Sequence, residues 1–182
     1  MKKFEASLSF LTILIVAILY GCTGASSKSP DVSENVRRSL DQAGLKDVTV
    51  NQDRDKGVVT LGGHVAYDAD KSQAESIAKA SAGKQVVANE IAVLPPGIED
   101  DSKTANSDLD KGIEKNLDAA FLMAKLNKSV SYDVKNGVVK LTGNVNSESK
   151  RKLAESIASN VPNVRQVVNE LDVKNRKTTS SD

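Results

Sequence analysis

The sequence has little of the chemistry on which enzymes and metalloproteins depend. Its 182 residues include one cysteine, one histidine and no tryptophan. A lone cysteine cannot form an internal disulfide. His64 has no second histidine and no free thiol with which to build a zinc site or a nucleophile–base pair, and neighbouring acids such as Asp100 and Asp101 are expected to be solvated. We therefore expect no enzyme, no metal, no cofactor and no small-molecule substrate.

The amino terminus lacks an apolar run long enough for a comfortable membrane span, which takes roughly 20 residues. A basic start at Lys2 and Lys3 is followed by a shorter apolar run from Leu8 to Tyr20. This layout is typical of a secretory signal. The sequence therefore predicts an export signal over residues 1–21.

The only cysteine, Cys22, follows directly in the motif Leu19-Tyr20-Gly21-Cys22. This motif resembles the lipobox of bacterial lipoproteins, in which a diacylglycerol is joined to the cysteine sulfur and the signal is cut just before it. The resemblance implies a Cys22 that carries acyl chains such as palmitate, with residues 22–31 as its tether. Because Thr23 is not aspartate, it also implies sorting to the periplasmic face of the outer membrane. An uncleaved anchor or an ordinary signal with an incidental cysteine are the alternatives.

The mature chain has no excess of either charge. Lys2, Lys3 and Glu5 leave with the signal, and they account for the difference between the 25 basic and 24 acidic residues of the full chain. Nucleic-acid binding depends on a basic surface that neutralises phosphates. The charge balance therefore argues against nucleic acid as a partner, and against simple electrostatic adsorption to anionic lipid.

An internal repeat dominates the rest of the chain. Residues 57–65 recur as residues 137–145, and at the same offset Glu75-Ser76-Ile77-Ala78 matches Glu155-Ser156-Ile157-Ala158. Two similar blocks in one register indicate two copies of one structural unit. We expect the first module over residues 32–94 and the second over 109–174, joined by a linker at 95–108 and followed by a disordered tail at 175–182.

Each copy predicts the order helix, strand, strand, helix, strand. Val36 and Leu40 recur at helical spacing after Ser33, and Asn136-Gly137 marks a hairpin turn between two alternating strands. The alternation predicts one apolar and one wet face for each sheet. The expected fold is α+β, with two tandem αββαβ modules, each a small three-stranded mixed sheet with two helices on one face.

Both copies follow the pattern G-V-V-x-L-x-G-x-V, then a helix ending in Ile-Ala, then V-x-N-x-[IL]-x-V. This pattern resembles the BON domain, and Gly63 and Gly143 match its characteristic glycine. A chain with two such domains and a lipobox resembles periplasmic proteins implicated in outer-membrane integrity. The resemblance implies phospholipid binding and no catalysis.

Four residues of the motif are expected to be structural. Gly63 and Gly143 fit a place where a strand packs closely beneath a helix or bulges. Asn89 and Asn169 share a face with core positions, so their amides must find hydrogen-bond partners, for which a neighbouring loop is expected.

The first helix of the second copy carries apolar residues on more than one face. Ile113, Leu117, Ala120 and Ala124 are expected to face the sheet. At about 100° per residue, Leu122 lies nearly opposite Ile113, and its apolar neighbours lie at the edge of the core stripe or away from it. The expected membrane contact consists of Phe121, Leu122, Met123, Lys125 and Leu126.

The sequence thus leads to the hypothesis of a non-enzymatic, lipid-anchored periplasmic protein that binds phospholipid membrane and supports the cell envelope. Packing of the apolar helix against the first copy, or against a protein partner, remains an alternative. In that case the protein is a scaffold that docks an envelope partner and is held at the membrane solely by its lipid.

Overall fold

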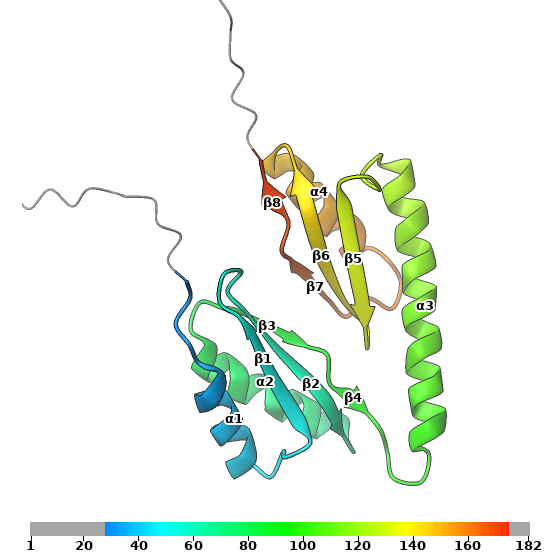
Figure 1. Ribbon diagram of the computed structural model, residues 1–182. Coiled ribbons are helices and arrows are strands. Elements are labelled where there is room, and N and C mark those ends of the chain that lie inside the picture. Colours follow the sequence, from blue (N-terminus) through cyan, green and yellow to red (C-terminus); the bar gives the residue numbers. More distant parts are fainter. Residues whose placement is uncertain (1–27, 175–182) are drawn as a thin grey trace, which may run out of the picture.

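The computed structural model describes residues 28–174 (Figure 1). The expected signal, Cys22 and the tail after Lys174 lie outside the described residues. Within this range, none of the helices combines the length and the apolar character that a membrane span requires.

The first module is built around a central strand, β2, which runs antiparallel to β1 on one side and parallel to β3 and β4 on the other. β3 and β4 are two short pieces of one edge strand, interrupted at residues 90–91. The elements of the first module are α1 (Ser33–Gln42), β1 (Val48–Asp53), β2 (Val58–Val65), α2 (Asp68–Ala82), β3 (Val86–Asn89) and β4 (Ala92–Val93).

The second module repeats this arrangement, with β6 at its centre, β5 antiparallel to it, and β7 and β8 parallel to it. The predicted α+β fold with two tandem αββαβ modules is confirmed. Its elements are α3 (Glu99–Met123), β5 (Val130–Lys135), β6 (Val138–Val145), α4 (Glu148–Ser159), β7 (Gln166–Asn169) and β8 (Asp172–Val173).

Each module has its own core between its sheet and its two helices. The second helix of each module approaches the sheet through alanines four residues apart, Ala74 and Ala78 in α2 and Ala154 and Ala158 in α4, all fully buried. Small side chains allow the helix to lie close to the sheet. Leu153, next to Ala154 on α4, is 47% exposed.

The expected linker at 95–108 is wrong beyond Ile98, because α3 begins at Glu99. The acidic run that resembles a linker forms the first turn of this helix, where negative charge is favourable next to the helix N-terminus. Ser102, Asn106 and Asp110, spaced four residues apart, are half-buried, whereas most of their neighbours on this stretch are exposed. α3 lies beside β4 of the first module. A helix, and not an extended linker, therefore forms most of the connection between the two modules.

The two modules pack against each other, so the prediction of a wet outer face is wrong over part of each sheet. Val58 and Ala88 of the first module form a buried apolar cluster with Val138 and Val168 of the second. The members correspond at the repeat offset, so the modules meet through equivalent surfaces, much as identical subunits do in a two-fold dimer. We call this contact the seam.

The modules are antiparallel across the seam, and β2 and β6 point in opposite directions (Figure 1). Lys56, in the β1–β2 turn, forms an ion pair of 2.7 Å with Asp172 of β8. Asn136, in the β5–β6 turn, donates from Nδ2 to the carbonyl of Glu90 at 2.7 Å. The β1–β2 turn therefore points the same way as the C-terminal end of α3, and the C-terminal end of α1 points the opposite way.

Candidate functional site

The C-terminal end of α3 divides the expected membrane contact into buried and exposed residues. Phe121 and Leu126 are 1% and 2% exposed, so the expectation that they face a membrane is wrong. α3 ends at Met123, and Lys125 adopts a positive φ of 56°. This turns the chain back, the Leu126 amide donates to the Phe121 carbonyl at 2.9 Å, and Leu126 enters the core.

Leu122 and Met123 are 63% and 80% exposed. The equivalent residues at the end of α1 are Asp41 and Gln42, since Leu40 and Leu45 occupy the core places of Phe121 and Leu126. The same fold therefore presents a polar end in the first module and an apolar end in the second. Core packing does not require Leu122 and Met123 to be apolar.

The end of α3 is held firmly on the sheet. The Tyr132 ring of β5 lies 5.9 Å from that of Phe121, and its hydroxyl donates to the Asp118 carboxylate. Partial burial and the neighbouring carboxylate raise the pKa of Tyr132 well above its usual value of 10. Tyr132 thus stays neutral, and it anchors the helix turn that precedes Leu122.

Gly63 and Gly143 are required by close contact with the loop that precedes the first strand of each module. A Cβ on Gly63 would lie 2.0 Å from the Asp47 carbonyl oxygen, and one on Gly143 would lie 2.5 Å from that of Ser129. Both glycines have positive φ angles, 81° and 118°. The neighbour is a backbone carbonyl rather than the helix that the sequence suggests.

Asn89 and Asn169 join the last strand of each module to its second helix. The Asn89 amide donates to the Lys71 carbonyl and to Glu75 Oε2, at 3.2 and 3.0 Å. Asn169 makes the same pair of bonds to the Arg151 carbonyl and to Glu155. Their partners lie on α2 and α4, not on a neighbouring loop.

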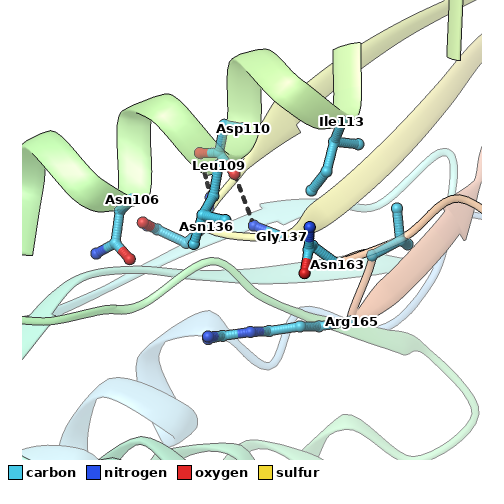
Figure 2. A pocket seen from close by; sticks show the side chains of 9 residues that line it. Asn106, Leu109, Asp110, Ile113, Asn136, Gly137, Asn163 and Arg165 are labelled. Atoms are coloured by element: carbon cyan, nitrogen blue, oxygen red, sulfur yellow. Dashed lines mark hydrogen bonds between the residues drawn. The ribbon is translucent and has the colours of Figure 1, made fainter. Parts of the chain in front are cut away.

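A hollow of about 170 Å³ lies between α3 and the β5–β6 turn (Figure 2). Asp110 accepts hydrogen bonds from the Asn136 and Gly137 amides at 2.7 and 2.9 Å, so its carboxylate is engaged in holding the turn. Arg165 runs along the opposite wall (Figure 2). The polar groups of this hollow therefore attach the β5–β6 turn to α3.

The described residues contain no group of three or more His, Cys, Asp or Glu side chains suited to a metal ion. His64 is exposed on β2. The sequence reasoning missed Gln166, which binds β3 of the first module, and Asp110, which holds the β5–β6 turn, because the partners of both lie far away in the chain.

Comparisons with known proteins agree with the two-module fold. Residues 29–95 and 109–175 match the BON domain family. The chain is 29% identical over 150 residues to osmotically-inducible protein Y of Escherichia coli (strain K12), an alignment that covers 79% of this chain and 71% of that protein.

Two solved structures of CdsD, described as a structural protein of the type III secretion system of Chlamydia trachomatis, are more distant. One shows 12% identity and a TM-score of 0.35, with 80% of this chain and 63% of that chain covered. The other, its C-terminal domain, shows 15% identity and a TM-score of 0.35, with 81% and 100% covered. These values are too low to support an argument about function. Both modules match the same family, so the chain belongs to the BON-domain family.

Proposed function

We propose that the protein is a non-enzymatic component of the cell envelope that contacts a phospholipid membrane through Leu122 and Met123. The observation that carries this proposal is the exposure of two large apolar side chains at the end of α3, where the first module has Asp41 and Gln42. Exposed apolar patches on small domains mark interaction surfaces. Lys125 beside them is exposed and suits the headgroup region of a bilayer.

The size of the patch fits shallow, reversible insertion. Full burial of a leucine or methionine side chain contributes about 1.5–3 kcal/mol. Scaled by the exposed fractions of 63% and 80% for Leu122 and Met123, the pair contributes about 2–4 kcal/mol. That is too little for a permanent anchor, which agrees with a separate lipid attachment at Cys22.

The antiparallel packing of the two modules supports an orientation in which Leu122 and the start of the described chain face the same membrane. The described chain starts beside the β1–β2 turn, where the Ser29 amide donates to the Arg54 carbonyl. That turn points the same way as the C-terminal end of α3. A tether of a few residues from Cys22, at about 3.3–3.6 Å per extended residue, therefore starts on the side of the molecule that carries Leu122.

Liposome co-sedimentation tests the membrane contact. The chain expressed from residue 23 onward lacks acyl chains, so any binding comes from the folded modules. Leu122→Asp should weaken binding by about tenfold or more, since apolar burial is lost and an acidic side chain is added. The matched control is Tyr67→Asp, because Tyr67 is 61% exposed on the end of the first module that points away. Equal binding by the Leu122→Asp variant and the unmodified chain would refute the proposal.

The attachment at Cys22 and the outer-membrane location belong to the same proposal. Mass spectrometry of the mature amino terminus, combined with membrane fractionation, tests cleavage, acylation and location together. An unmodified cysteine or a chain that starts at Met1 would contradict the anchor. A scaffold that docks an envelope protein is the alternative, and crosslinking to one stoichiometric partner without liposome binding would favour it.

A further inference from the structure

We propose that the membrane contact extends from α3 onto α4, where Leu153 is a third apolar anchor, and that four lysines around these anchors select anionic phospholipid. This inference rests on the proposed function, but it concerns a different helix and names the class of lipid. It depends on the position of Leu153, on the charges nearby, and on a comparison of the two modules.

Leu153 lies on the flank of α4 that faces α3. The opposite flank is turned to β7, because Arg151 donates to the Asn169 carbonyl and Glu155 accepts from the Asn169 amide. Leu153 shares its own flank with Ile157, four residues later, which packs on the core. α3 and α4 are in contact, so Leu153, which is 47% exposed, borders the outer surface between the two helices.

The N-terminal half of α4 lies at the same end of the second module as Met123. α4 starts just after β6, and Asn144 at the end of β6 donates its amide to the carbonyl of Ser129, in the loop that follows α3. Leu153 lies in the second turn of α4. The three exposed apolar residues thus come from one end of a continuous two-helix layer.

Basic side chains surround this end. Lys125 and Lys128 lie in the loop after α3, and Lys150 and Lys152 lie in the first half of α4; all four are exposed. Within residues 28–174 none of them forms an ion pair, whereas the nearby acid Glu148 is paired with Arg151 at 3.4 Å. Unpaired lysines around apolar anchors suit a surface of anionic headgroups, where each contributes about 1 kcal/mol.

The first module shows that the fold does not require these residues. The places of Leu122, Met123 and Leu153 are taken by Asp41, Gln42 and Gln73 in the first module. The charges differ as well, since Asp70 and Ser72 stand where the second module has Lys150 and Lys152. Every exposed apolar position of the contact, and two of its lysines, are thus polar or acidic in the other copy.

A tryptophan placed on α4 tests whether Leu153 enters lipid. The chain has no tryptophan, so Leu153→Trp in the chain from residue 23 onward provides a single fluorophore. With vesicles of phosphatidylglycerol whose acyl chains are brominated, its emission should be quenched. Gln73→Trp, at the same place in the first module, should not be quenched. Absence of quenching at position 153 would overturn the proposal.

Binding measurements separate this inference from the proposed function. Leu153→Asp should weaken binding to phosphatidylglycerol vesicles about threefold to tenfold, and Gln73→Asp should not. Lys150→Glu with Lys152→Glu should reduce the preference for phosphatidylglycerol over phosphatidylcholine. If Leu122→Asp abolishes binding while the α4 variants bind normally, the α4 contact is refuted and the α3 contact stands. If only the α4 variants lose binding, the contact through α3 is refuted instead.

Discussion

Replacement of Gln166 by alanine should weaken the seam by removing a clamp that joins the two modules. Gln166 lies at the start of β7, and its side chain pairs with the edge of β3 in the other module. Its Oε1 accepts from the backbone N–H of Asn89 at 3.1 Å, and its Nε2 donates to the Val87 carbonyl at 2.7 Å. One side chain thus satisfies two backbone groups that a further strand would otherwise pair.

The magnitude follows from these two bonds. Each is worth about 0.5–1.5 kcal/mol net, so Gln166→Ala should lower the free energy of unfolding by about 1–3 kcal/mol. Urea unfolding of the chain from residue 23 onward measures the loss. Gln73→Ala, an exposed glutamine of α2, should change it by less than about 0.5 kcal/mol. A Gln166→Ala value equal to that of this control would show that the clamp does not form in solution.

Four other substitutions test single positions of the fold. Burial raises the pKa of Glu90 above 4.5. Its carboxyl therefore favours folding below the unfolded pKa and loses this contribution as pH rises through the folded pKa, so the stability of Glu90→Gln relative to the unmodified chain should increase from pH 4 to pH 7 in urea titrations. Gly143→Ala should destabilise the protein by about 2 kcal/mol or more, because its Cβ would meet a carbonyl oxygen. Gly112→Ala, in open space on α3, should stabilise the protein by up to about 1 kcal/mol. Thermal unfolding compares the two variants. Asp110→Ala should speed hydrogen exchange at the backbone amides of Asn136 and Gly137, which donate to the Asp110 carboxylate. Unchanged exchange would contradict a role of Asp110 in holding this turn.

The sequence predicts the architecture well because the information for it is local and appears twice. Alternating valines, the Asn136-Gly137 turn and the shared glycine each act on their own neighbours, and the repeat fixes their register. The helical periodicity also places Leu122 and Met123 away from the core of the second module, and both side chains are exposed. These features need no knowledge of the other module.

The errors arise where the outcome depends on chain reversal or on distant contacts. Periodicity at about 100° per residue places Leu126 outside the core, but the helix ends before it, and the positive φ of Lys125 returns Leu126 to the core. The acidic start of α3 has the composition of a linker, yet the helix there lies against the first module. The alternation of the strand places Val168 on the wet face of its sheet. In the structure the equivalent surface of the first module covers it.

The antiparallel seam also determines which charges a membrane would meet. In the first module, the end equivalent to the proposed contact carries Asp41, Asp68 and Asp70. A parallel arrangement of the copies would bring these acids beside the anchors, where they would repel anionic headgroups. Instead they point to the opposite end of a molecule whose α3, 25 residues long, spans about 37 Å. That length exceeds the screening distance of about 8 Å at physiological salt. The chain from residue 22 onward is formally neutral, yet the proposed contact is a basic, apolar end. The charge balance that argues against adsorption of the whole chain therefore does not apply to that end.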